Sequence, residues 1–185
     1  MNHLTVNSQT GLLEPIVYRP SPHYDERPQG TLVDMVVVHS ISLPAGEFGG
    51  SAVEEFFCGH LDTSSHPTFT SIAALKVSAH LFIRRMGEII QFVPFNKRAW
   101  HAGESYFQGK THCNNFSIGI ELEGTDNVPY ASIQYTQLGK VINLLMQAYP
   151  GITLDRILGH VDIAPGRKTD PGPFFDWQHL KGILL

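Results

Sequence analysis

Cysteine is scarce in this sequence, and no apolar run is long enough to cross a bilayer. Only Cys58 and Cys113 occur among 185 residues, so a disulfide framework is not indicated and we expect two reduced thiols. The apolar stretches fall short of the ~20 residues that a transmembrane helix needs. The first residues lack the basic and apolar regions of a secretory signal. These absences predict a soluble protein in the cytoplasm, with no membrane partner.

A surplus of basic charge is also missing. Thirteen Lys and Arg residues stand against 17 Asp and Glu residues, which gives a formal net charge of -4. Because nucleic-acid binding depends on clustered Lys and Arg, nucleic acid is not an expected partner. Histidine, in contrast, is abundant, with ten residues. Imidazoles titrate near neutral pH and serve mainly metal binding and proton transfer, so several of them are candidate functional residues.

Length and composition predict one globular domain over residues 1–185. Hydrophobic residues make up 42% of the chain and charged residues 16%, and a chain of this length buries roughly 70% of its unfolded surface in one core. Residues 1–30 contain prolines spaced among polar residues, so we expect an irregular leader segment packed on the domain. We expect a monomer.

Apolar patterns predict strands over 33–38, 78–84, 88–93 and 116–122. The first is almost wholly apolar and β-branched, as in a buried central strand, and it ends at His39. The second and third flank Gly87 and predict a hairpin. The fourth alternates apolar with small or polar residues, which is typical of a strand, and Glu121 lies near its end.

Helical spacing predicts helices over 51–58, 132–149 and 174–185. Ser51 is a candidate cap for the first helix, and Pro150 follows the end of the second. Strands interleaved with helices predict an α/β domain with a mixed central β-sheet flanked by helices. Sites in such domains gather at the carboxyl ends of strands, where His39 and Glu121 are expected.

The densest chemical signal is the segment GHVDIAPGRKTDPGPFFDW at 159–177. It contains His160 and Asp170 in a stretch that is too rich in Gly and Pro to be helical, so a loop can bring both side chains to one point. Together with His39 they would give zinc three protein ligands and leave a fourth position for water, the pattern of catalytic zinc sites. Zinc lowers the pKa of bound water toward ~7, which predicts metal-assisted amide hydrolysis.

Two further residues complete this proposed chemistry. Glu121 is the candidate general base and acid, and Lys168 is the candidate that stabilises the developing oxyanion. Glu123 is an alternative to Glu121, because residues two apart share one strand face. Asp162 and Asp176 are alternatives to Asp170, although a loop brace and a helix cap are the better interpretations of these two carboxylates.

The remaining aromatic and thiol side chains have structural interpretations as well. Trp100 could fill the core, but its neighbours His101 and Gly103 favour a groove lining. His80 is expected to pack within its strand. Cys113 has no nucleophile arrangement around it and is expected to be a structural thiol. The other histidines are expected at the surface: His3, His23, His60, His66 and His179.

The motifs VVVHSIS, VSAHLFIRR, RAWHAGES, CNNFSIGIELEGTD and GHVDIAPGRKTDPGPFFDW occur in a family's order and spacing. From about Leu12 to Gln178 the chain resembles the amidase_2 family of N-acetylmuramoyl-L-alanine amidases, which shares the peptidoglycan-recognition fold. The resemblance implies a mixed sheet with flanking helices and a zinc ion in an open surface groove. It also implies the ligands and catalytic residues: His39, His160, Asp170, Glu121 and Lys168.

The resemblance further implies a substrate. The members most like this chain cut the lactyl-L-alanine bond of 1,6-anhydro-N-acetylmuramyl peptides during cytosolic cell-wall recycling, which indirectly restrains β-lactamase induction. The implied substrate-binding positions are Ser40, Lys76, Trp100, His101, His112 and Ala164. Three of them depart from the family, which commonly has Asn at Ser40, Arg at Lys76 and another Arg at His112. Lys does not reproduce a bidentate Arg contact to a peptide carboxylate.

Two other functions fit the same fold. One is a peptidoglycan-binding module without catalysis, which the intact ligand set argues against. The other is an amidase that acts on intact cell wall, which would need export.

Overall fold

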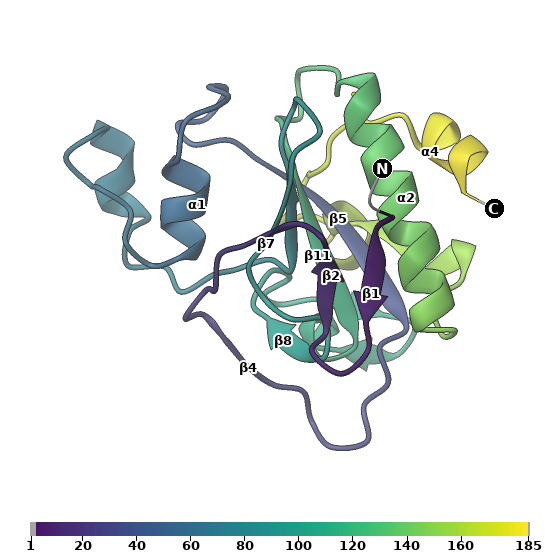
Figure 1. Cartoon of the computed structure of the whole chain (residues 1–185). Helices are drawn as coiled ribbons and strands as arrows, with labels where there is room; N and C mark the ends of the chain where they lie inside the picture. Colours follow the sequence, from purple (N-terminus) through teal and green to yellow (C-terminus); the bar gives the residue numbers. More distant parts are fainter. Residues whose placement is uncertain (1–2, 185) are drawn as a thin grey trace.

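The computed structural model describes residues 3–184, which form a six-stranded mixed sheet flanked by helices (Figure 1). The strand order is β12-β5-β11-β6-β7-β3, and all pairs are parallel except β6 with β7. This confirms the predicted single α/β domain and the hairpin. The strands are β3 (Val17–Tyr18), β5 (Met35–Ile41), β6 (Leu81–Ile83), β7 (Ile89–Gln91), β11 (Ser117–Glu123) and β12 (Ile157–Gly159).

Helices cover both faces of the sheet. In Figure 1, α2 and α4 lie on one side of the sheet and α1 on the other. The three predicted helices are present with shorter ends. The helices are α1 (Ala52–Phe57), α2 (Ser132–Ala148), α3 (His160–Ile163) and α4 (Trp177–Ile183), with 3-10 turns at Pro67–Ser71, Cys113–Asn115 and Leu154–Arg156. Within residues 3–184, no helix has the length and apolar character that a membrane crossing requires.

The leader segment is more regular than the sequence analysis predicted. It contains β1 (Thr5–Asn7), β2 (Leu12–Glu14), β3 and β4 (Tyr24–Glu26). β1 and β2 form a hairpin, β3 joins the central sheet beside β7, and β4 pairs with β8 (Lys97–Ala99). Two of these pairings join positions far apart in the chain, which a local pattern does not reveal. A fourth small pairing joins β9 (Tyr106–Phe107) to β10 (Lys110–Thr111).

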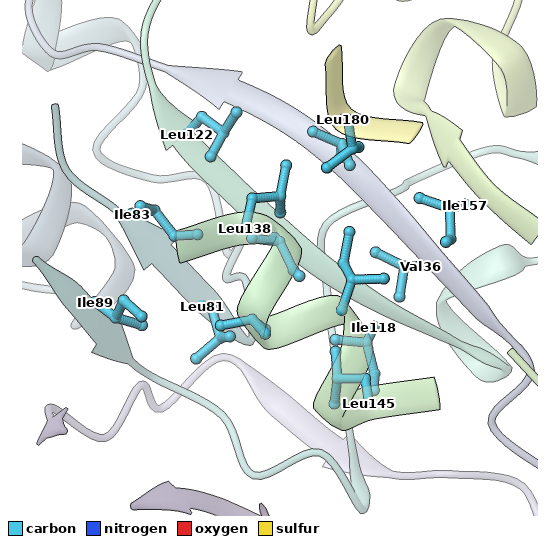
Figure 2. Packing of buried hydrophobic residues seen from close by; sticks show 14 of the residues in the cluster. Val36, Leu81, Ile83, Ile89, Ile118, Leu122, Leu138, Leu145, Ile157 and Leu180 are labelled. Carbon is cyan, nitrogen blue, oxygen red and sulfur yellow. The ribbon is translucent and has the colours of Figure 1, made fainter. Parts of the chain in front are cut away.

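Along β5 and β11, successive side chains face alternately toward the hydrophobic core and toward the candidate site. Their α2-facing residues belong to the main hydrophobic cluster: Val36, Val38, Ile118, Ile120 and Leu122. Figure 2 shows Val36 and Ile118 gathered with Leu138 and Leu145 of α2 and Leu180 of α4. Because side chains alternate along a strand, His39 and Glu121 point to the opposite face. The predicted period of two is confirmed, but all seven residues of β11 are buried, since both faces are covered.

Three local expectations were wrong. β5 continues past His39 to Ile41. Ser51 stands at the N-cap position of α1, but its hydroxyl donates to Glu55 Oε1 at 2.6 Å and does not cap the helix. Residues 160–163, expected in a loop, form one helical turn that Asp162 braces by accepting from the Gly159 N–H at 2.7 Å. This turn ends before Pro165, so the Gly- and Pro-rich composition excludes a helix only from Pro165 onward in this segment.

Candidate active site

Parallel pairing of three strands assembles one side of the site. Glu121 of β11 lies opposite His39 of β5 in register. β12 pairs with β5 on its other side, with Gly159 opposite Val38, so His160 emerges beside His39. The carboxyl ends of parallel strands meet at one edge of a sheet, which places these three side chains together although they are far apart in the chain.

Asp170 completes the cluster from the loop that comes after α3. The Val161 N–H donates to the Asp170 carbonyl at 3.0 Å, which folds the loop back onto the turn. The Nδ1 atoms of His39 and His160 are 3.0 Å apart, and each is 3.1 Å from Asp170 Oδ2. The structure therefore brings the three predicted ligands to one point, and their ligand atoms could hold a metal ion.

The outer nitrogens of the two histidines show which way their lone pairs face. His160 Nε2 is 3.0 Å from the Ala102 carbonyl, which can only accept, so Nε2 carries the proton and Nδ1 presents a lone pair. His39 Nε2 is 2.9 Å from His101 Nδ1. With Nδ1 of both rings unprotonated, two lone pairs and a carboxylate oxygen converge, which is repulsive without a cation. The donor set, two neutral imidazoles and one carboxylate, fits zinc.

Burial keeps His39 in the form that a metal needs. Desolvation lowers the pKa of His39 to about 4, outweighing its contact with Asp170. Burial acts on Asp170 in the opposite direction, but the contacts with His160 and His39 outweigh it and hold the pKa of Asp170 below its usual range. At neutral pH the cluster therefore contains a neutral imidazole and an ionised carboxylate, as metal binding requires.

Glu121 is a buried carboxyl group beside this cluster. The residue is 9% exposed, and its Oε2 atom is buried with no hydrogen-bond partner among residues 3–184. Desolvation and the charge of Asp170 raise the pKa of Glu121 well above its ordinary value, and Lys168 opposes the shift. A raised pKa and a free oxygen are the properties of a group that takes up and returns a proton.

Glu123, the alternative base, is occupied by structural contacts. Its carboxylate accepts from the Arg85 N–H at 2.9 Å and from the Gly49 N–H, and it lies 4.0 Å from Arg84 Nη1. Both oxygens of this carboxylate are therefore engaged by groups of the surrounding loops. The structure therefore favours Glu121 for proton transfer.

A cleft of about 280 Å³ opens over the cluster. Its walls contain the five proposed catalytic and metal-binding residues together with Ser40, Trp100 and His101. The three other substrate positions predicted from resemblance are not among the lining residues: Lys76 and His112 are exposed and Ala164 is buried. Trp100 is thus a wall of the cleft, and its ring stacks on His23 with 6.3 Å between centroids.

The other predicted side-chain roles are confirmed in most cases. Asp162 braces α3, and Asp176 caps α4 by accepting from the His179 N–H at 2.8 Å, so both structural interpretations are confirmed. His80 is fully buried, as expected, and accepts from the Gly119 N–H at 3.0 Å. His23 and His66 were predicted at the surface but are partly buried. Cys113 is a buried thiol.

The sequence analysis did not identify two residues that support the site, Arg27 and Asn114. Arg27 of the leader donates to the carbonyls of Phe95, Asn114, Asn115 and Ser117 at 2.9–3.3 Å. Burial lowers the pKa of Arg27 to about 10. The Asn114 side chain accepts from the N–H groups of His101 and Ala102 at 3.1 and 2.8 Å. No sequence signal points to Arg27; the adjacent asparagines in CNNF were a weak cue for Asn114.

Comparison with known proteins places this geometry in a family. The family model described as N-acetylmuramoyl-L-alanine amidase matches residues 29–173. The chain belongs to this amidase family. It is 57% identical over 165 residues to the 1,6-anhydro-N-acetylmuramyl-L-alanine amidase AmpD of Escherichia coli, covering 89% of this chain and 90% of the relative.

Solved structures agree with this placement. A crystal structure of a Se-Met AmpD derivative superposes with a TM-score of 0.92 at 53% identity, covering 95% of this chain and 98% of that chain. The Escherichia coli N-acetylmuramyl-L-alanine amidase AmiD, in complex with the substrate anhydro-N-acetylmuramic acid-L-Ala-D-gamma-Glu-L-Lys, matches with a TM-score of 0.60 at 28% identity. It covers 85% of this chain and 60% of that one. The mixed sheet and its cleft are therefore those of an N-acetylmuramoyl-L-alanine amidase.

Proposed function

We propose that this amidase is a zinc enzyme that hydrolyses the bond between the lactyl group of 1,6-anhydro-N-acetylmuramyl peptides and their L-alanine. The observation that carries the proposal is the convergence of His39 Nδ1, His160 Nδ1 and Asp170 Oδ2 at 3.0–3.1 Å beside the buried Glu121. Three protein ligands leave an open position, as catalytic zinc sites do.

His39, His160 and Asp170 would hold the zinc ion. When bound, zinc supplies a Lewis acid that polarises the scissile carbonyl and acidifies an attacking water. The carbonyl of Ala102 and the imidazole of His101 fix the orientation of the two histidine rings. Such outer contacts keep ligand atoms in place before the metal arrives, which reduces the cost of ordering them.

Glu121 transfers the proton, and Lys168 stabilises the negative charge that develops during the reaction. Glu121 removes a proton from the attacking water and returns it to the nitrogen of the departing L-alanine. Its raised pKa makes the carboxylate a better proton acceptor than an ordinary glutamate. The Lys168 ammonium lines the same cleft and stabilises negative charge on the amide oxygen as it develops.

The substrate class rests on the relatives. The AmpD relative carries the name 1,6-anhydro-N-acetylmuramyl-L-alanine amidase, and AmiD was solved with an anhydro-N-acetylmuramic acid peptide. We infer that Ser40 and Trp100 face this substrate in the cleft, which His101 also lines, and that Lys76, His112 and Ala164 lie at its margin. We further infer that the enzyme is a monomer in the cytoplasm, where it recycles wall fragments and so indirectly restrains β-lactamase induction.

Metal removal tests the reaction. Dialysis against a chelator is expected to abolish hydrolysis of anhydro-N-acetylmuramyl-tripeptide, and zinc is expected to restore it. Mass analysis of the products should show the free tripeptide and the anhydromuramyl sugar. Activity that is indifferent to the chelator, or cleavage at another bond, would contradict the proposal.

Two substrates separate this function from its rivals. The purified enzyme is incubated with the soluble anhydromuropeptide and, in parallel, with whole sacculi. Rapid release of peptide from the soluble compound alone is expected. Release from sacculi at a comparable rate would instead favour an amidase of intact wall, and binding to either without release would favour a peptidoglycan-binding module.

A further inference from the structure

His101 lies behind the metal cluster, between the central strand β11 and His39. Its ring meets the His39 ring edge-on with 5.0 Å between centroids. On its other side is Gly119, where an added Cβ would stand 2.3 Å from His101 Cγ. The φ of Gly119 lies outside the left-handed region, so no backbone need explains this glycine. Glycine inside a strand marks the close approach of another group, and here that group is the His101 ring.

In the hydrogen bonds around His101, the donor and the acceptor of each bond can be assigned. The chain of contacts ends at the Cys113 carbonyl, which can only accept, so the Ser117 hydroxyl donates to it at 2.7 Å. Ser117 Oγ then accepts from His101 Nε2 at 3.2 Å. With its proton on Nε2, a neutral His101 presents the lone pair of Nδ1 to His39 Nε2 at 2.9 Å. His39 consequently carries its proton on Nε2 and keeps Nδ1 free.

The backbone of His101 is fixed independently of its ring. The N–H groups of His101 and Ala102 both donate to Asn114 Oδ1, and the Ala102 carbonyl accepts from His160 Nε2. Adjacent residues of one short segment therefore orient both metal-binding histidines, His101 through its side chain and Ala102 through its backbone.

From these contacts we infer that His101 is a positioning residue, which fixes His39 in the Nε2–H form and so directs Nδ1 to the metal site. The inference rests on the proposed zinc function, and it assigns to His101 a role that differs from substrate binding. Partners of this kind outside the ligand set commonly contribute about 10–100-fold to metal affinity.

Two variants of equal shape test the role of the hydrogen bond. In His101→Asn, Oδ1 takes the place of Nδ1 on the same Cγ atom and can accept from His39. In His101→Leu, a methyl group stands there and cannot accept. The zinc dissociation constant, measured by competition with a chromogenic chelator, is expected to rise about 10–100-fold in His101→Leu and to stay within a few-fold of wild type in His101→Asn.

Ser117→Ala extends the test along the same chain of contacts. It removes the acceptor of His101 Nε2 without touching His39, so His101 loses its preferred protonation. Nitrogen-15 NMR of the histidine rings should show His39 protonated at Nε2 in the wild-type protein and in His101→Asn. A mixture of the two tautomers is expected in His101→Leu and Ser117→Ala.

Three results would overturn the inference. Equal loss of zinc affinity in His101→Leu and His101→Asn would show that the hydrogen bond is not what matters. Unchanged zinc affinity in both, with a raised KM, would make His101 a substrate-binding residue. If wild-type protein itself binds no zinc, the proposed function fails together with this inference; zinc binding by wild type confines a failure to His101.

Discussion

Glu121 and His39 occupy the same register position on the neighbouring parallel strands β11 and β5. Their side chains therefore leave the sheet on one face and at one level, which puts the proposed base beside the first metal ligand. Backbone pairing, rather than a flexible loop, sets this relationship. Sites built on strands hold their geometry more closely than sites on loops, so the roles of the two residues can be separated by single substitutions.

Glu121→Gln is expected to separate proton transfer from metal binding. The amide keeps the shape of the side chain but cannot take up the proton of the attacking water, so kcat should fall by about 10²–10⁴-fold. Glu121 is not part of the ligand cluster, so the zinc content by elemental analysis should equal that of wild type. Loss of zinc in this variant would make Glu121 a ligand instead.

Glu123→Gln is the matched control, two residues along the same strand. Glu123 accepts from the Arg85 and Gly49 N–H groups, so this variant should lose stability, by about 1–3 kcal/mol, while kcat changes little. If kcat fell as far as in Glu121→Gln, the assignment of the base would be reversed.

The stability of the metal-free protein should depend on pH through Glu121. Because burial raises its pKa above 4.5 in the folded protein, the folded state retains a proton that the unfolded chain has already released in the window above 4.5. The free energy of unfolding contributed by this group therefore decreases as the pH rises through that window. Glu121→Gln lacks the effect, so the variant should gain stability relative to wild type with rising pH. Urea denaturation of both apoproteins across the window measures this difference, and parallel curves would contradict it.

Lys168→Met tests oxyanion stabilisation with a side chain of similar length. The ammonium of Lys168 lines the cleft, and loss of one group that stabilises the developing charge typically lowers kcat by about 10²–10³-fold. Zinc affinity should change little, since Lys168 is not a ligand. The control is Lys181→Met on the exposed side of α4, which should retain wild-type kcat. Equal rates in the two variants would remove Lys168 from the reaction.

The sequence predicted much of the site because histidine, aspartate, glutamate and lysine are residue types that bind metals, transfer protons or stabilise charge. His39 comes directly after a β-branched run, and His160 and Asp170 share one Gly- and Pro-rich segment, so strand-end placement and a folding loop were sufficient to suggest convergence. Glu121 and Lys168 were candidates from their positions in the sequence, and the family motifs favoured Glu121 over Glu123. These features depend on local composition and on the carboxyl-end rule for parallel sheets.

The rest depends on contacts between distant segments. β3 joins the sheet only because Val17 meets Ile90, and the partly buried Arg27 donates to the carbonyls of four distant residues. His101 was assigned to substrate binding because the family resemblance implied it. Its contact with His39 depends on the register of β11 and the missing side chain at Gly119, which no local pattern displays.

Gly119→Ala should reveal how tightly β11 and His101 are packed. The new Cβ would lie 2.3 Å from the His101 ring, so the ring or the strand must move, and overpacking of this kind costs about 1–3 kcal/mol. In the His101→Ala background that space is empty, and the same substitution should cost much less. Denaturant unfolding of the four proteins gives the coupling energy between the two positions. Gly182→Ala, on α4, where the new Cβ meets no side chain of residues 3–184 within 4 Å, is the control and should be neutral or stabilising by up to about 1 kcal/mol. If Gly119→Ala costs the same with and without the His101 ring, the glycine serves the strand itself, and the close packing of His101 against β11 is not what orients His39.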